Sequence, residues 1–213
     1  MSNSKHSKYA CVVFYNDINE DLLIDLSTKV DNIIAVDGAY RDFPHIKPFS
    51  TDGSIEIAKK YAKVIEVKEA WETQVDKRNA YIRRVPIGSS FIVIDTDEEL
   101  CSSFKEGNQN VIIQAVAEGG IEYRMPRVYV RTPGLRYYKT HMTLKDRNGI
   151  VDFTKFKDSD VVIKHHLNMR DEQRQKDKEI YRKEHDKREL KDREEIIGGL
   201  LDSSGPKAKK HRM

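Results

Sequence analysis

Short apolar runs alternate with helix-like segments along the first half of the chain. The runs are continuous and rich in β-branched residues, which is typical of strands buried on both faces of a sheet, and they lie at 9–15, 32–36, 63–67 and 91–94. The segments between them have helical spacing, and we expect helices over 20–29, 54–62 and 71–84. Strands that alternate with helices predict right-handed βαβ units, and therefore an α/β fold with a mostly parallel sheet.

Polar residues mark two of the helix starts. Asn19 is expected to cap the first helix, and residues 50–53 (STDG) to open the second, with Glu56 placed to return a capping bond. The rest of the body is expected to add strands to the same sheet, at 110–116, at 160–164 and as short pieces within 121–138 that are interrupted by Pro126 and Pro133. The sheet is thus predicted to be mixed.

An acidic stretch follows the apolar run at 91–94. Because side chains alternate along a strand, Asp95 and Asp97 are expected to point the same way and Thr96 the opposite way. Two carboxylates at the end of a buried strand repel each other unless a cation lies between them. Oxygen ligands suit Mg²⁺ or Mn²⁺, whose coordination is then completed by the phosphates of a substrate. The alternative is that Asp97, Glu98 and Glu99 open a helix.

Two further groups of residues could serve a site at this edge of the sheet. His166, at the end of the strand over 160–164, could complete a metal site begun by Asp97, although histidines more often form ordinary hydrogen bonds. The arginines of the segment 124–136 could bind an anion or lie on an exposed hairpin; they are Arg124, Arg127, Arg131 and Arg136.

Charge separates the chain into a body and an extension. Residues 168–213 contain 14 Lys and Arg against 11 Asp and Glu, which accounts for the whole formal charge of +3. A neutral body argues against a nucleic-acid partner. We therefore expect one domain over 1–167, a charged helix over 168–202 that is a candidate for homo-oligomer formation, and a disordered basic tail over 203–213 that is a candidate for peripheral membrane contact.

Other sequence features bear on where the protein works. The chain contains no apolar run of membrane-spanning length and no secretory signal at its start, so a cytoplasmic protein is expected. Cys11 and Cys101 are its two cysteines, and they do not have the spacing of metal ligands.

With these motifs assembled, residues 9–170 resemble a family 2 glycosyltransferase of the GT-A fold. The likeness rests on order: Asn16-Asp17 and Asp37 after the first two strands, STDGS at 50–54, Arg78-Asn79 after Trp71, IDTDE at 94–98, and His165-His166 before a charged helix. It resembles the branch that transfers sugars onto lipopolysaccharide cores and related glycans. The resemblance implies a GT-A, Rossmann-like sheet flanked by helices.

The resemblance also implies an activity. A sugar would pass from a nucleotide-diphosphate sugar to a glycan or other hydroxyl acceptor, with Mn²⁺ or Mg²⁺ bound by Asp95, Asp97 and His166 and a carboxylate accepting the proton. Residues implied to contact the donor are Asn16, Asp17, Asp37, Asp52, Arg78 and Asp95. No motif identifies the general base, for which the candidates are Glu118, Glu122 and Asp146.

The sequence departs from the family where residues 39–49 separate Asp37 from the STDGS run, which bears on the shape of the base pocket. Two other functions compete with the transferase. A nucleotidyltransferase would normally carry a glycine-rich phosphate loop after the first strand, and 15–20 contains no glycine. A non-catalytic scaffold would use the charged helix to bind a partner and keep the body as a degenerate nucleotide-binding domain.

Overall fold

The structure, a computed structural model, describes residues 7–116, 120–166 and 176. The predicted charged helix over 168–202, except for Lys176, and the predicted tail over 203–213 lie outside these residues, as does Glu118. Among the helices that are described, none has the length and apolar character needed to cross a membrane.

An eight-stranded sheet forms the centre of the described chain, in the order β3-β2-β1-β4-β7-β6-β11-β5. Its strands are β1 (Lys8–Val13), β2 (Asn32–Val36), β3 (Lys63–Ile65), β4 (Ser90–Asp95), β5 (Glu98–Leu100), β6 (Gln109–Ala115), β7 (Glu122–Val130) and β11 (Lys157–His165). The first four in spatial order pair in parallel, as the βαβ pattern predicts. β7 runs antiparallel between β4 and β6, and β5 runs antiparallel to β11. The sheet is mixed and mostly parallel, which confirms the α/β class.

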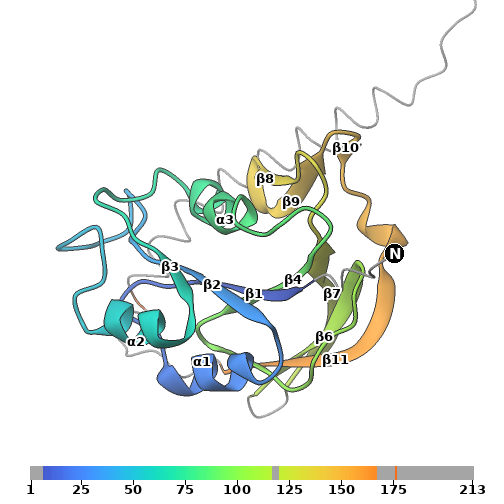
Figure 1. Ribbon diagram of the computed structural model, residues 1–213, viewed down its shortest axis with the longest axis horizontal. Coiled ribbons are helices and arrows are strands. Elements are labelled where there is room, and N and C mark those ends of the chain that lie inside the picture. Colours follow the sequence, from blue (N-terminus) through green and yellow to red (C-terminus); the bar gives the residue numbers. More distant parts are fainter. Residues whose placement is uncertain (1–6, 117–119, 167–175, 177–213) are drawn as a thin grey trace, which may run out of the picture.

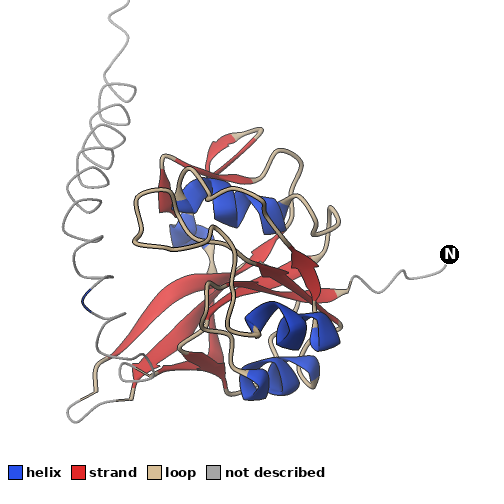
Figure 2. Cartoon of the chain, turned by 90° about the vertical axis from the view of Figure 1, so that its left-hand side faces the viewer, coloured by secondary structure: helices blue, strands red, loops and turns tan. Residues whose placement is uncertain are grey.

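Secondary structure covers both faces of this sheet (Figures 1 and 2). On one face lie α1 (Glu20–Ser27) and α2 (Ser54–Tyr61), and on the other α3 (Gln74–Ile82). Beside α3 is a small antiparallel sheet of β8 (Arg136–Tyr138), β9 (Thr140–Asp146) and β10 (Gly149–Ile150), followed by the 3₁₀ helix η1 (Phe153–Lys155). The small sheet was not predicted, because its strands are short and largely polar.

Burial on both faces explains the continuous apolar runs of the central strands. In β1, Ala10 and Val12 pack toward α1 and α2, while Cys11 packs toward α3 and the small sheet. The same alternation holds along β2 and β4, which flank β1. Removal of both sets of side chains from water stabilises the sheet at about 25 cal/mol for each Å² of apolar surface that is buried.

The helix starts match the expectations in part. Asn19 caps α1 as predicted, since its side chain accepts a hydrogen bond from the backbone N–H of Asp21 at 2.9 Å. The residue that caps α2 is Gly53, in the left-handed region at φ 90°, without a side-chain capping bond, so the predicted capping box is wrong. Asp52 instead accepts from the backbone N–H of Ser54 at 3.0 Å.

The structure also decides two points about the later strands. The alternative in which the acidic residues after β4 open a helix is excluded, because these residues form a tight turn and then β5, which pairs with the end of β11. The segment around Pro126 is one continuous strand, β7, and Pro126 lies opposite Asn110 next to an irregularity in the β6–β7 register. Both outcomes depend on pairing with strands that are distant in sequence.

Candidate functional site

The loops that follow β1 and β2 are joined by hydrogen bonds at the carboxyl edge of the sheet. Asn16 has a positive φ of 51°, its backbone N–H donates to Ser50 Oγ at 2.7 Å, and its side-chain oxygen accepts from the backbone N–H of Thr51 at 2.7 Å. Asp17 accepts from the Thr96 hydroxyl at 2.7 Å, which links the β1 loop to the acidic turn after β4. The structure therefore brings Asn16 and Asp17 to the edge at which the resemblance expects a donor.

Asp37 lies beneath this edge. It has no exposed surface, and Ser50 donates to its carboxylate through both the hydroxyl, at 2.6 Å, and the backbone N–H, at 3.1 Å. Burial raises the pKa of Asp37 and the bonds from Ser50 oppose that rise. In this conformation Asp37 supports the loop at 50–53, whereas Asp52 in that loop is exposed.

A buried lysine that the sequence did not single out holds the same loops from below. Lys77, on α3, is 2% exposed and donates to the carbonyl oxygens of Phe14 at 2.7 Å and Gly38 at 2.5 Å. Its ammonium group lies 5.2 Å from the centre of the Tyr40 ring. An ammonium that donates to two carbonyls is partly compensated for the loss of water, so Lys77 fixes the ends of β1 and β2 relative to α3.

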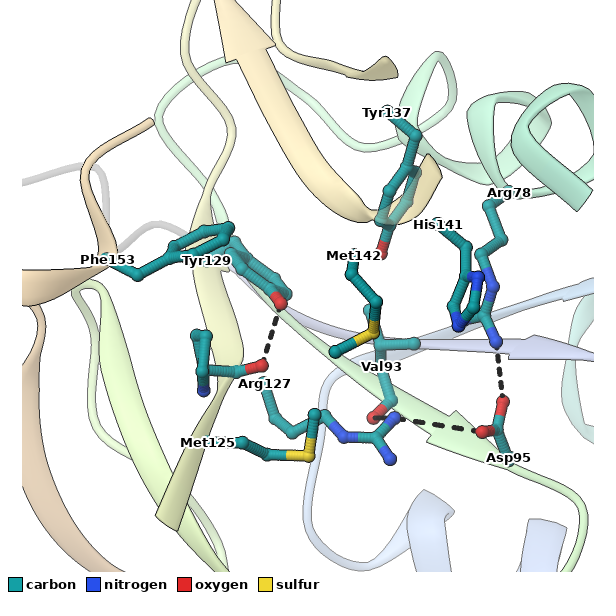
Figure 3. Close-up of a pocket in the computed structure, with 11 residues that line it drawn as sticks. Arg78, Val93, Asp95, Met125, Arg127, Tyr129, Tyr137, His141, Met142 and Phe153 are labelled. Carbon is teal, nitrogen blue, oxygen red and sulfur yellow. Dashed lines mark hydrogen bonds and ion pairs between the residues drawn. The ribbon is translucent and has the colours of Figure 1, made fainter. Parts of the chain in front are cut away.

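The acidic turn after β4 directs its carboxylates to different surroundings. Asp95 ends the strand and accepts from Arg78 at 3.0 Å, with Arg127 at 3.8 Å (Figure 3). Asp97 is 6% exposed and lies 3.4 Å from Nε2 of His165, at the end of β11. Because β4 ends at Asp95, the alternation of side chains along a strand does not extend to Asp97, and the two carboxylates have different hydrogen-bond partners.

The pairing of β11 with β5 decides which histidine meets Asp97. His165 does so, and its hydrogen bond to Asp97 raises the pKa of the imidazole. The predicted ligand His166 lies beside Glu99, at 3.3 Å. Within the described residues no group of three or more His, Cys, Asp or Glu is arranged to enclose a metal ion. Asp97 and His165 thus bring one carboxylate and one imidazole together at this edge of the sheet.

Glu98 is the most deeply buried acid of the turn. Its side chain is 2% exposed, accepts from Arg127 at 2.5 Å and accepts from the backbone N–H of Asp95 at 2.8 Å. Burial raises the pKa of Glu98 to about 7, even though Arg127 acts in the opposite direction. The Glu98–Arg127 pair therefore holds the turn in place and can change its charge near neutral pH.

A cavity of about 210 Å³ opens on the α3 side of the turn, between the large sheet and the β8–β9 hairpin (Figure 3). Asp95 and the two arginines line one part of it and aromatic and sulfur-containing side chains the rest. The lining residues are Arg78, Val93, Asp95, Met125, Pro126, Arg127, Tyr129, Tyr137, His141, Met142 and Phe153. The cavity thus combines an apolar wall with a charged end, as small-molecule sites do.

The remaining residues predicted for the site lie elsewhere. Glu122 is exposed at the start of β7, and Asp146, at the end of β9, accepts from the Thr132 hydroxyl at 3.2 Å and the backbone N–H of Asn148 at 2.7 Å. Neither lines the cavity. Of the arginine cluster, Arg127 reaches the cavity, while Arg131 donates to carbonyl oxygens of its own turn.

The described site therefore has three parts: a hydrogen-bonded rim at the ends of β1, β2 and β4, formed by Asn16, Asp17, Ser50 and Thr96; the Asp97–His165 pair; and the arginine-lined cavity beside Asp95. In the comparisons with known proteins, no protein-family model and no curated protein matches this chain. Its function must therefore be argued from the geometry of these three features.

Proposed function

We propose that the protein is a metal-dependent transferase that moves a sugar from a nucleotide-diphosphate sugar to a glycan or other hydroxyl acceptor, on a sheet of the GT-A type. The observation that carries the proposal is the division of the acidic turn. One carboxylate, Asp97, lies beside an imidazole, and the other, Asp95 at the end of β4, lies beside two arginines that line a cavity. A diphosphate leaving group needs both kinds of positive partner, a cation and guanidinium groups.

Asp97 and His165 are the residues that fit a divalent cation. They present a carboxylate oxygen and an imidazole nitrogen from two different strands, and the His165 side chain is 28% exposed, so a substrate could complete the coordination. Mg²⁺ strongly prefers oxygen ligands, so the imidazole favours Mn²⁺ over Mg²⁺. When bound, the ion would neutralise charge on the departing diphosphate.

The rim above β1 and β2 is the proposed position of the nucleotide. In open α/β sheets, ligands bind outside the carboxyl ends of the strands, where Asn16, Asp17 and Thr96 meet. Asp37 contributes indirectly, because it holds Ser50 and thereby the loop at 50–53. The reaction is a displacement at the anomeric carbon, in which Arg78 stabilises the nucleotide diphosphate as it leaves.

Thermal unfolding with a panel of nucleotide-diphosphate sugars, with and without Mn²⁺, tests the proposal. A donor should raise the unfolding midpoint only when Mn²⁺ is present, by a free energy that grows with the ratio of ligand concentration to Kd. Asp97→Asn and His165→Gln should each abolish this increase. His166→Gln is the matched control, because the His166 side chain lies beside Glu99, and the bond from His166 to Asp97 joins backbone atoms that the substitution keeps.

Two results would contradict the proposal. A donor that stabilises the protein equally in the presence of a chelator would remove the metal from the mechanism. A loss of the increase in His166→Gln, with His165→Gln unaffected, would show that the pair identified by the structure does not bind the ion.

A further inference from the structure

The cavity beside Asp95 contains a group that the proposed reaction has not yet used. A transfer to a hydroxyl acceptor requires a base that takes the proton of the attacking hydroxyl. The predicted candidates Glu122 and Asp146 do not line the cavity, and Glu118 lies outside the described residues. His141, on β9, does line it, together with residues from α3, β4, β7 and β8.

The path of β9 brings His141 to this position. The β8–β9 pairing changes register abruptly, since Tyr137 lies opposite Leu144 whereas Tyr138 lies opposite Thr140. Residues 141–143 therefore bulge from the ladder, and bulges redirect the side chains that they carry. The bulge contains both His141 and Met142, and both line the cavity (Figure 3).

The other titratable groups of the cavity are poorly suited to accept a proton. Arg78 and Arg127 keep their protons at any physiological pH. Asp95 is ion-paired with Arg78 at 3.0 Å and lies 3.8 Å from Arg127, so its negative charge is already stabilised.

The tyrosines and the neighbouring acid do not change this conclusion. Burial raises the pKa values of both Tyr129 and Tyr137, so each keeps its hydroxyl proton. Glu98 is bound to Arg127 and to the backbone N–H of Asp95, and it does not line the cavity. The imidazole of His141, in contrast, has a ring nitrogen that can accept a proton, and it lines the cavity.

The aromatic and sulfur-containing side chains of the cavity indicate what kind of molecule enters. Tyr129, Tyr137 and Phe153 present aromatic surface, and Met125 and Met142 present flexible apolar surface. Flat apolar walls of this kind suit the C–H face of a sugar ring, while its hydroxyl groups point toward the polar end.

We propose that this cavity receives the acceptor sugar and that His141 is the catalytic base of the transfer. This inference rests on the proposed function. An imidazole nitrogen of His141 takes the proton from the acceptor hydroxyl, and the hydroxyl oxygen forms a bond to the anomeric carbon of the donor. The bond between that carbon and the diphosphate oxygen breaks, and its electron pair leaves with the nucleoside diphosphate.

Release of nucleoside diphosphate from the donor, with Mn²⁺ and with water as the acceptor, tests this assignment on the full chain. The donor is the nucleotide sugar that gives the largest thermal stabilisation. His141→Gln should lower the rate about 10²- to 10⁴-fold, the range for loss of a general base. The donor-induced rise in unfolding midpoint should be unchanged. His45→Gln is the matched control, because His45 is exposed in the loop at 39–49 and does not line the cavity.

Two additional readouts separate a catalytic role from a structural one. The pH profile of the rate should differ between wild type and His141→Gln, because the variant has no ionisable side chain at this position. Added imidazole should restore part of the rate of His141→Ala. Each result would support the assignment.

Other outcomes would overturn it. An unchanged rate and pH profile in His141→Gln, or loss of donor stabilisation together with the rate, would mean that His141 is not the base. If a donor stabilises wild type and His141→Gln has a normal rate, the assignment of His141 as the base is rejected and the proposed transferase function is retained. No donor stabilisation of wild type at all would remove the proposed function, and this inference with it.

Discussion

The buried carboxyl of Glu98 should make the stability of this protein depend on pH. Its folded-state pKa is about 7, against an ordinary value of 4.5, because the side chain is almost completely removed from water. In the unfolded chain Glu98 loses its proton near pH 4.5, whereas the folded protein retains it to about pH 7. Stability from this group is therefore fully present below pH 4.5 and is lost as the pH rises through 7.

The size of this effect follows from the two pKa values. At about 1.4 kcal/mol per pH unit, the interval between 4.5 and about 7 corresponds to about 3 kcal/mol. Most of the change falls between pH 5 and pH 8, where we expect about 2–3 kcal/mol. Glu98→Gln cannot ionise, so the free energy of unfolding of wild type minus that of the variant should fall by this amount across the range.

Urea unfolding at several pH values from 5 to 8, in the presence of a chelator, measures this difference. Glu99→Gln is the matched control, because the Glu99 side chain is 45% exposed on the same strand. Its difference from wild type should not vary by more than a few tenths of a kcal/mol. Curves for wild type and Glu98→Gln that run parallel from pH 5 to pH 8 would refute the reasoning that burial controls the ionisation of Glu98.

Three further substitutions test the supports of the site by unfolding free energy. Gly38→Ala should destabilise the protein by more than about 2 kcal/mol, because φ is +113° and an added Cβ would lie 2.5 Å from a side-chain methyl group. Gly53→Ala is the control: an added Cβ there would meet open space, so the loss should be about 1 kcal/mol. Equal losses at the two positions would contradict the packing argument. Asn19→Ala should lower the free energy of unfolding by about 1 kcal/mol, because α1 loses its N-terminal cap. An unchanged free energy of unfolding would mean that the cap does not stabilise the protein. Arg78→Met should cost about 3–5 kcal/mol, because Asp95 loses its ion pair with Arg78. Asp95→Asn in the same chain should recover part of that loss. Additive losses in the double mutant would mean that the two side chains do not interact.

Much of the fold could be predicted because the central strands are buried on both faces. A buried strand must be apolar along its whole length, so β1, β2 and β4 are visible in the sequence as continuous runs. The strands of the small sheet are short and contain many polar residues, so β9 and β10 were missed, and β8, which lies within the predicted strand pieces of 121–138, was not assigned to a separate sheet. The continuity of β7 through Pro126 also escaped prediction, because a proline is tolerated there only by the local irregularity in its pairing with β6.

The site was predicted in its residue types more than in its geometry. The sequence correctly indicated an acidic turn at the end of a buried strand, polar loops after β1 and β2, and a histidine pair at a strand end. It did not indicate that Lys77 is buried beneath the loops, because a lysine in a helix is normally exposed. The sequence signal is the helical position of Lys77 and Arg78, which lie on the same buried face of α3 as its apolar residues.

The sequence by itself determined the alternation of strands and helices from β1 to β4, the position of the acidic residues after β4 and the chemistry available at the sheet edge, because these depend on local pattern and on alternation along each strand. Tertiary structure alone decided which partner each side chain meets. The antiparallel pairing of β5 with β11 selects His165 rather than His166 for Asp97, and the bulge in β9 carries His141 into the cavity. Such choices follow from the register between strands far apart in the chain, where a shift of one residue exchanges every inward side chain for its neighbour.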